Sequence, residues 1–528
     1  MKMICCLHLI TESASEQKTT QYLITMKRLM LFASAILLLA ADAHAFCGFY
    51  VAKADVKLSN KTSQVIIVRD GELSTITMSS DFNGPVNDFA MVVPVPVVLQ
   101  QNDIKVVNRL VFDQLDAYSA PRLVEYYDND PCNTYYYRDR YAAIPQAAKS
   151  ESAGDNAVEE KDAEKYQVKI EAKYSVGEYD ILILSAKESG GLERWLNDNG
   201  YKIPAGAKEV LDPYIKSNMK FFVVKVNLDE YKKQGGSATI DGSLPLSPIQ
   251  IKFNSPKFML PIRLGMANAD GAQDMLVYAF SRKGRIETTN YRTVPMPTGQ
   301  KIPLFVRDEF SEFYRDTYSK TWKREGKNVV FLEYAWDVTL NGGMKCDPCV
   351  GPPPMFNELA QAGVNWLVAD QWGSATGFVY FTRMHVTYER NTFPQDLMFQ
   401  ETPNRQNFQA RYVLTNPAGS GFECAAGQQY IRELSQRRWN ELYTYQWLSG
   451  RSIDAHRAYP AEYNAYLKRN KDDDKKQGSF GAPMFGGGDN DDGKPSQPFG
   501  VWLLSAATLG AVLFSLSRRR VVLPVATV

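Results

Sequence analysis

The chain has few histidines and lacks the sequence motifs of several common enzyme classes. It contains 4 histidines, and two of them, His8 and His44, lie in an N-terminal segment that we expect to be removed. It has no Gly-x-Ser-x-Gly elbow, no glycine-rich phosphate loop and no His-Glu-x-x-His pair. A catalytic or metal centre built mainly from histidine is therefore disfavoured, and the sequence predicts neither a metal nor a cofactor.

Net charge is also nearly absent. The 60 lysines and arginines almost cancel the 59 aspartates and glutamates, which leaves a formal charge of +1. No global charge indicates a nucleic acid partner, and we expect none. Aromatic residues are plentiful at 12% of the chain, a composition that is typical of strand-rich folds, where rings pack on a pleated surface.

Long apolar runs occur only near the two ends. At the N-terminus, Lys27 and Arg28 precede an apolar run over residues 29–41, and Ala43-His44-Ala45 follows. This order predicts a secretory signal peptide cleaved after Ala45, because the run is shorter than the roughly 20 residues of a membrane span. A buried core helix is the alternative. We interpret residues 1–45 as leader and signal peptide, with the true start at Met26.

At the C-terminus, residues 499–517 are almost uncharged and long enough to cross a bilayer. Arg518, Arg519 and Arg520 follow and should stop transfer, with residues 518–528 as a cytoplasmic tail. This predicts a single-pass anchor in the inner membrane, with the body in the periplasm or outside the cell. A buried helix and a sorting signal that is later clipped are the alternatives.

Between these ends, the composition divides the chain into an exported body and a stalk. We expect an α+β, strand-rich body in several parts and a disordered stalk rich in glycine, aspartate and proline. The predicted parts are an N-terminal β-rich unit at 46–145, a flexible insertion at 146–165, a central α+β unit at 166–300, a C-terminal α+β unit at 301–470, and the stalk at 471–498.

Hydrophobic periodicity predicts the main elements. Residues 65–68 and 73–78 indicate a hairpin that turns at Asp70-Gly71, and residues 376–388 alternate as the clearest strand. Pro94 and Pro96 mark residues 89–99 as an edge strand or an extended exit. Helical spacing predicts several helices. They cover residues 104–118, 191–196, 207–216, 308–322, 424–448 and 454–468.

Export decides how the cysteines are interpreted. Of the 7 cysteines, Cys5 and Cys6 fall in the leader, so five remain. The candidates for structural disulfides are Cys47, Cys132, Cys346, Cys349 and Cys424. We expect most of them to pair in an oxidising compartment, with one thiol left over because five is odd.

The segment Cys346-Asp347-Pro348-Cys349 is the only candidate for reactive chemistry. This spacing is compatible with a structural disulfide, thiol–disulfide exchange or zinc binding. The prolines that follow, in residues 350–354, disfavour a helix starting at Cys346, and no second Cys-x-x-Cys is present. We therefore favour a structural disulfide, within this segment or with Cys424, and keep exchange as the alternative.

Other possible site residues have ordinary structural explanations. We expect His385, on a strand face beside Arg383, to be packed or hydrogen-bonded, and His456 has no evident partner set. The tyrosines Tyr126, Tyr127 and 135–137 could offer stacking surfaces to a glycan or a peptide. Packing in the core or between parts is the more economical explanation.

Several segments, taken in order, resemble the bacterial family known as domain of unknown function 2330. They are Phe46-Cys47-Gly48-Phe49-Tyr50, 64–71, Asp88-Phe89-Ala90, Val93-Pro94-Val95-Pro96, Gly177-Glu178-Tyr179-Asp180, 195–201, 260–266, Cys346 to Cys349, Thr382-Arg383-Met384-His385, Asp396-Leu397 and 407–412. The resemblance implies an exported and often membrane-anchored protein. It implies no catalytic or binding residue.

Together these features predict a membrane-tethered, non-catalytic protein that binds or organises an envelope protein or a glycan. The alternative is an extracytoplasmic enzyme, either a thiol–disulfide oxidoreductase that uses Cys346 and Cys349 or a hydrolase with unidentified carboxylates.

Overall fold

The computed structural model describes residues 49–52, 59–60, 63–79, 82–83, 89–132, 168–199, 207–233, 246–267, 271–340, 345–349, 351–369, 375–419 and 422–460. The chain divides into two units, Met1–Ala465 and Tyr466–Val528, and all of these residues belong to the first. The predicted signal peptide, insertion, stalk, apolar segment 499–517 and tail lie outside the described residues, as does Cys47.

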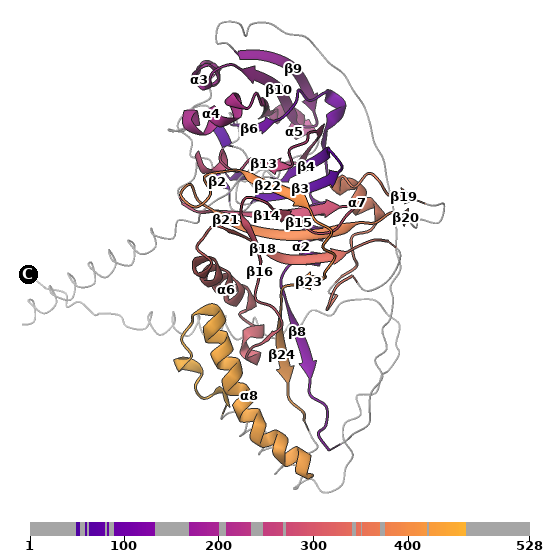
Figure 1. The fold of residues 1–528 in the computed structure, drawn as a ribbon, viewed down its shortest axis with the longest axis vertical. Helices are drawn as coiled ribbons and strands as arrows, with labels where there is room; N and C mark the ends of the chain where they lie inside the picture. The colour runs from indigo at the N-terminus through magenta and orange to yellow at the C-terminus, as the bar shows by residue number, and fades with distance from the viewer. Residues whose placement is uncertain are drawn as a thin grey trace, which may run out of the picture. The chain divides into compact units, whose positions relative to one another are not determined.

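An antiparallel sheet of five strands forms one half of the body (Figure 1). Its order is β1 (Phe49–Ala52), β6 (Phe89–Val95), β11 (Lys220–Val226), β10 (Tyr179–Ala186) and β9 (Val168–Val176). The helices α3 (Ser189–Asp198) and α4 (Ala207–Lys216) cover its outer face, where Leu192, Trp195 and Leu211 pack on Phe221 and Val223.

A mixed sheet of nine strands forms the other half. Its main path is β16 (Arg292–Pro295), β18 (Val329–Asp337), β21 (Tyr380–Tyr388), β14 (Gln273–Ser281), β3 (Ser63–Asp70), β4 (Leu73–Ser79), β12 (Ile249–Asn254) and β7 (Ile104–Val106), with β23 (Phe408–Gln409) paired to β18. The β14–β3 and β16–β18 pairs are parallel and the others are antiparallel.

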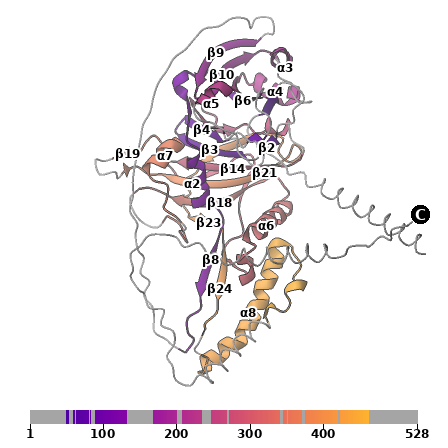
Figure 2. The same ribbon diagram turned by 180° about the vertical axis from the view of Figure 1, so that it is seen from behind.

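The two sheets face each other across the largest core cluster, so the body has four layers. Val93, Ile181 and Val224 of the five-stranded sheet pack into the same cluster as Ile251 and Val277 of the nine-stranded sheet. On its other face the nine-stranded sheet is covered by α2 (Leu110–Ser119) and α7 (Phe356–Ala362). Figures 1 and 2 show α3 and α4 beside the five-stranded sheet, at the end of the body away from α8.

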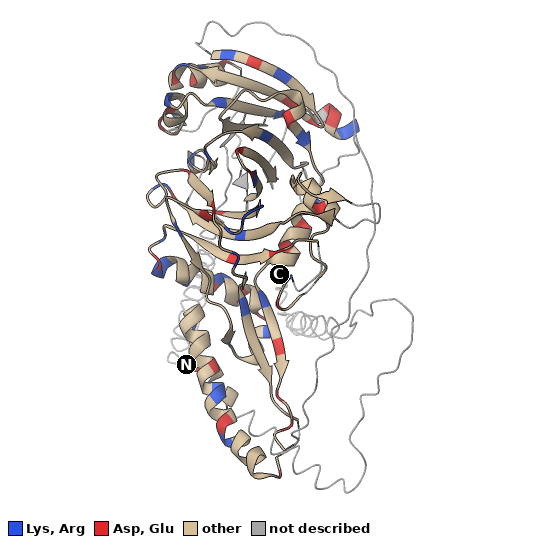
Figure 3. Cartoon of the chain, turned by 45° about the vertical axis from the view of Figure 1, so that its right-hand side comes forward, with Lys and Arg blue, Asp and Glu red and all other residues tan. Residues whose placement is uncertain are grey.

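A smaller lobe extends from these layers. The parallel strands β17 (Gln300–Lys301), β24 (Arg411–Asn416) and β8 (Arg122–Tyr127) form its sheet. The long helix α8 (Ala425–Ser449) packs beside them, and its Leu442 and Tyr445 share a core with Phe313 of α6 (Phe310–Arg324). Basic and acidic residues alternate along α8 (Figure 3).

The remaining elements are short. They are β2 (Ser59–Asn60), β5 (Phe82–Asn83), β13 (Met259–Leu260), β15 (Ile286–Thr288), β19 (Val368–Ala369), β20 (Ala375–Thr376), β22 (Leu397–Glu401), α5 (Leu228–Lys233), η1 (Gln101–Asp103), η3 (Gly265–Ala267), η4 (Leu304–Arg307) and η5 (Asp454–His456). Among the described residues, no helix is long and apolar enough to cross a bilayer.

An α+β, strand-rich body was predicted, and the structure confirms it. The predicted hairpin is β3–β4, with Gly71 in the left-handed region at φ 62°. The predicted long helix is α8, which begins one residue later than expected because Cys424 is its N-cap. The strand predicted at 376–388 is split into β20 and β21.

Two predicted elements differ from the structure. The helix expected from Ile104 starts only at Leu110, because residues 104–106 instead form β7 and pair with β12. The segment 89–99 was expected to be an edge strand or an extended exit. Along Phe89–Val92 it is not an edge, since β6 lies between β1 and β11, whereas residues 96–99 lie beyond the end of the strand. Its Pro94 is tolerated because β1 pairs only as far as Val92, so the missing donor interrupts no ladder on that side.

The predicted division of the body does not correspond to separate sheets. Strands β3 and β4 come from the N-terminal unit, β12 and β14 from the central unit, and β18 and β21 from the C-terminal unit, yet all lie in the nine-stranded sheet. The described parts of 46–145, 166–300 and 301–470 therefore share one core.

Candidate functional site

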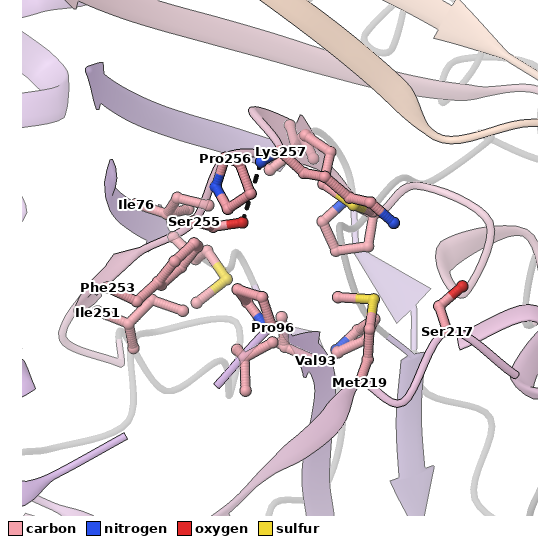
Figure 4. A pocket seen from close by; sticks show the side chains of 16 residues that line it. Ile76, Val93, Pro96, Ser217, Met219, Ile251, Phe253, Ser255, Pro256 and Lys257 are labelled. Atoms are coloured by element: carbon pink, nitrogen blue, oxygen red, sulfur yellow. Dashed lines mark hydrogen bonds between the residues drawn. The ribbon is translucent and has the colours of Figure 1, made fainter. Parts of the chain in front are cut away.

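The space between the two sheets contains a cavity of about 210 Å³. Its walls come from β4, β6, β12, β13, the loop between α4 and β11 and the loop that leads into β13. In Figure 4, Ile251 and Phe253 line one side of the hollow, and Met219 lines the other. The complete lining is Ile76, Met78, Val93, Pro94, Val95, Pro96, Ser217, Met219, Ile251, Phe253, Ser255, Pro256, Lys257, Met259, Leu260 and Pro261.

The lining is mainly apolar, and three of its side chains are adaptable. Met78, Met219 and Met259 are unbranched thioethers, which adjust to ligands of irregular shape. Protein cores are packed to crystal-like density, and voids larger than a water molecule are few. An apolar cavity of roughly 150 Å³ already accepts benzene, so this one has room for an apolar group of at least that size.

Three of the lining residues, Ser217, Ser255 and Lys257, are polar. Lys257 and Ser217 are exposed, whereas Ser255 is buried and accepts a hydrogen bond from the Lys257 amide at 3.1 Å. The lysine therefore places a positive charge beside an apolar opening. This arrangement suits an amphipathic molecule with a negative group.

The loop that carries Lys257 is fixed by Arg69 of β3. The Arg69 guanidinium donates to the carbonyl oxygen of Ser255 at 3.0 Å and to the Ser74 hydroxyl at 2.6 Å. It also lies over the Phe258 ring, 5.1 Å from the centroid. Burial lowers the pKa of Arg69, although Glu401 and Glu72 oppose the shift. One wall of the cavity is therefore held by a buried cation.

A buried carboxylate, Asp396, holds the neighbouring wall together with the half-buried Arg263. Asp396 accepts hydrogen bonds from the backbone amide of Ile262 at 3.0 Å and from the Tyr214 hydroxyl at 2.6 Å. Arg263 pairs with the same carboxylate at 2.7 Å and lies over the Tyr214 ring. These contacts join α4 to the segment that follows Pro261. The cavity walls are thus rigidly supported on two sides.

The other face of the nine-stranded sheet contains a buried charge network. Glu333 of β18 accepts from Arg383 Nε at 2.7 Å, contacts His385 Nδ1 at 3.0 Å and accepts from the Tyr314 hydroxyl at 2.5 Å. Arg383 also donates to Asp116 of α2 at 2.6 Å. The network ties strands β18 and β21 to helices α2 and α6.

The charges in this network shift one another's pKa values. Burial opposes ionisation of Glu333, but Arg383 and His385 outweigh it and hold the pKa of Glu333 at about 2. Burial also opposes protonation of His385, but Glu333 and Asp274 outweigh it and raise the pKa of His385 to about 9. At neutral pH the network therefore contains an imidazolium, a guanidinium and carboxylates.

This network is arranged for structure rather than for proton transfer. His385 is stacked on Tyr318 with ring centroids 4.0 Å apart, and both of its ring nitrogens face carboxylates, since Nε2 lies 3.8 Å from Asp274. A general base needs a pKa near the working pH, and the pKa of His385 lies well above neutrality. The prediction of a hydrogen-bonded histidine is confirmed.

The cysteines form two disulfides. Cys132 pairs with Cys424, and Cys346 pairs with Cys349. The prediction that most exported cysteines pair is confirmed for these four, and no helix begins at Cys346. Cys47 lies outside the described residues, so its leftover thiol stays a prediction. Among the residues that the structure describes, no group of histidine, cysteine, aspartate and glutamate side chains could hold a metal.

The other predicted site residues lie apart from the cavity. His456 stacks on Phe305 at 4.0 Å between ring centroids, beside Tyr445. Tyr126 and Tyr127 are exposed at the end of β8, whereas residues 135–137 lie outside the described residues, as do Ala45 and the three arginines after residue 517. The structure brings none of them together with Cys346.

Sequence inspection missed the network carboxylates and the cavity. Glu333 interrupts the apolar and aromatic residues 329–336 of β18, and this interruption was a signal that could have identified a buried charge. The cavity had a weaker signal. Two segments of the family resemblance, 93–96 and 260–266, both contribute to its walls.

No curated protein and no solved structure matches the chain. The model of one family, described as an uncharacterized protein conserved in bacteria, DUF2330, matches residues 41–400, which is more than half of the chain. That span includes both cavity walls, the Glu333 network and the Cys346–Cys349 disulfide. The chain therefore belongs to the DUF2330 family of conserved bacterial proteins.

Proposed function

We propose that this chain is an exported, membrane-tethered binding protein that holds a small amphipathic ligand in the cavity between its sheets. The observation that carries the proposal is the cavity itself, about 210 Å³ in volume and lined mainly by apolar side chains. The ligand is an anion with an apolar part, such as a medium-chain fatty acid. Its apolar part enters between Met219 and Phe253, and its negative group lies near Lys257.

The contacts around the cavity favour a preformed binding site over one that forms only by a conformational change. Arg69 and Asp396 fix the two segments that border the cavity, so the ligand meets a preformed site. A preformed apolar site gains affinity because little side-chain ordering is needed on binding. The exported location and the C-terminal tether rest on the predicted signal peptide and on residues 499–520, and they are part of the proposal.

The ligand site is tested by NMR of the full-length chain in lipid nanodiscs, with methionine methyl groups labelled and sodium octanoate as the probe. We expect saturable shifts of the methyl signals of Met78, Met219 and Met259. Met266 is the internal reference. Its exposed fraction, 8%, is the same as that of Met219, but Met266 does not line the cavity. Shifts that spread equally to Met266, or no shifts at all, would exclude this site.

Two variants sharpen the test. Met219→Trp fills the cavity and should abolish octanoate binding, whereas Met266→Trp, a change of the same size at the same exposure, should preserve it. Lys257→Glu should weaken octanoate binding and leave binding of the uncharged analogue octanol unchanged. Equal effects of the two tryptophan variants would contradict the assignment.

The predicted membrane topology is tested separately. A tag after Val528 should be inaccessible from outside intact cells and accessible after permeabilisation. Recovery of the chain from the cytosol in a soluble form with reduced thiols would overturn the exported location.

A further inference from the structure

The two residues of the Cys346–Cys349 disulfide differ sharply in exposure. Cys346 is 1% exposed and belongs to the apolar cluster of Tyr334, Trp336 and Val379. Cys349 is exposed. An approaching thiolate can therefore reach the Cys349 sulfur, whereas Cys346 is protected by the core.

Hydrogen bonds from four side chains hold the backbone of the segment that carries the disulfide. The hydroxyl groups of Tyr118 and Tyr334 both donate to the carbonyl oxygen of Lys345, at 2.8 and 2.7 Å. Arg122 donates to the carbonyl oxygen of Pro348 at 2.9 Å. Arg411 donates to the carbonyl oxygen of Asp347 at 3.2 Å. Opening of the disulfide would therefore leave the backbone around it in place.

The two arginines that contact this segment differ in whether a carboxylate balances their charge. Arg411 is 2.6 Å from the Asp347 carboxylate, so its charge is compensated. Arg122 is 6% exposed, and its guanidinium donates hydrogen bonds to the carbonyl oxygens of Ala120, Pro348 and Tyr118. In the part of the chain that the structure describes, no carboxylate pairs with Arg122, and burial lowers its pKa.

A buried cation without a counter-ion is costly, and a nearby thiolate would relieve that cost. Arg122 contacts the segment between the two cysteines through the carbonyl oxygen of Pro348, at 2.9 Å. The oxidised segment carries no charge on sulfur, whereas the reduced segment can carry one as a thiolate. Stabilisation of the thiolate favours the reduced form and makes the disulfide a stronger oxidant.

We propose that Cys346–Cys349 is an exchangeable disulfide that oxidises the thiols of other exported proteins. A partner thiolate attacks Sγ of Cys349, a mixed disulfide forms, and Cys346 leaves as a thiolate whose charge is balanced by Arg122. A second partner thiolate then attacks the partner sulfur of the mixed disulfide and releases Cys349. The net change is the reduction of one disulfide in this chain and the oxidation of two partner thiols to one disulfide.

This activity goes beyond ligand binding, because the cavity and the disulfide use different residues. The test equilibrates the full-length chain in detergent with glutathione buffers of defined redox potential, followed by acid quenching, alkylation and mass spectrometry of each cysteine peptide. Cys132–Cys424 is the internal reference. We expect Cys346–Cys349 to open under clearly more oxidising conditions than Cys132–Cys424. If it opens only under equal or more reducing conditions, the proposal is wrong.

The role of Arg122 is tested in the same assay. Arg122→Gln should shift the equilibrium toward the disulfide by about tenfold, because loss of a buried charge partner moves a thiol pKa by roughly one unit or more. Arg122→Lys keeps the charge and should restore much of the effect. Arg411→Gln is the matched control and should shift the equilibrium by less than about threefold. Equal shifts in the two glutamine variants would overturn the assignment.

Single-cysteine variants identify the attacked sulfur without relying on Arg122. In Cys346→Ser the remaining Cys349 should react rapidly with iodoacetamide, and in Cys349→Ser the remaining Cys346 should react at least about tenfold more slowly because it is buried. Equal rates, or a faster Cys346, would contradict attack at Cys349.

Discussion

The carboxylate of Glu333 lies 2.7 Å from Nε of Arg383, and the exposed fractions of the two side chains are 1% and 5%. The pair joins β18 to β21, the second and third strands from the β16 end of the nine-stranded sheet. Because the same guanidinium reaches Asp116 of α2, the pair also fixes the helix that covers this face.

Removal of one member of this pair should be much more damaging than removal of both. Glu333→Gln leaves the Arg383 charge without its buried partner and should lower the free energy of unfolding by about 3–5 kcal/mol. The double variant Glu333→Gln with Arg383→Met should lose less than the sum of the single losses. Urea unfolding measures the free energy of unfolding of the single variants and of the double variant. Arg292→Met, which breaks an exposed pair with Glu325, should cost less than about 1 kcal/mol.

The same network predicts a pH window for stability. The pKa of His385 is raised from 6.5 to about 9, so its contribution is complete below pH 6.5 and is lost as the pH rises through 9. The pKa of Glu333 is lowered from 4.5 to about 2, so its contribution is present above pH 4.5 and is lost as the pH falls through 2. We therefore expect greatest stability from these two groups between pH 4.5 and 6.5.

His385→Gln tests the alkaline part of this window. The variant should be less stable than the parent at pH 6, and its unfolding free energy should change less between pH 7 and 10. Thermal unfolding followed by circular dichroism across this range measures the difference. An unchanged alkaline slope in the variant would show that other groups are responsible.

The two disulfides should differ in their contribution to stability. Cys132–Cys424 closes a loop of 292 residues, whereas Cys346–Cys349 closes a separation of 3. Because a cross-link restricts the unfolded chain more when the loop is longer, Cys132→Ala with Cys424→Ala should cost about 2–5 kcal/mol. Cys346→Ala with Cys349→Ala should cost less. Calorimetric melting of both double variants compares them, and the reverse order would contradict the loop argument.

Gly363, which ends α7, should not tolerate a side chain. Its φ is 105°, and a Cβ atom there would lie 2.7 Å from Cγ2 of Thr75 on the adjacent sheet. Gly363→Ala should therefore lower the unfolding free energy by about 2–4 kcal/mol through strain and overlap together. Gly71→Ala is the matched control, because Gly71 has φ 62° but nothing within 4 Å of its Cβ position.

Gly71→Ala should cost only about 1 kcal/mol, the usual penalty for a side chain in the left-handed region. Urea unfolding of the two alanine variants separates backbone strain from steric overlap. Equal losses would mean that Thr75 moves aside without cost.

Local sequence patterns predicted the elements that depend on neighbouring residues. The β3–β4 hairpin, α4, α6 and α8 were expected close to their observed bounds, because period-two and helical spacing and the Asp70-Gly71 turn are local. The same logic failed at Ile104, where pairing with β12 overrides a helical spacing of apolar residues. It also failed at Pro94, whose tolerance depends on the length of β1, a strand far away in the chain.

The sequence by itself determined the class of the body, the pairing of most cysteines after residue 45 and the hydrogen-bonded state of His385. Only the tertiary structure decided that strands from all three predicted units share one sheet, that Cys424 reaches Cys132, and that segments 93–96 and 255–261 enclose a cavity. The physical reason is the range of the forces involved. Propensity and periodicity act over a few residues, whereas strand order, buried ion pairs and cavities arise between surfaces that meet only after the chain has folded.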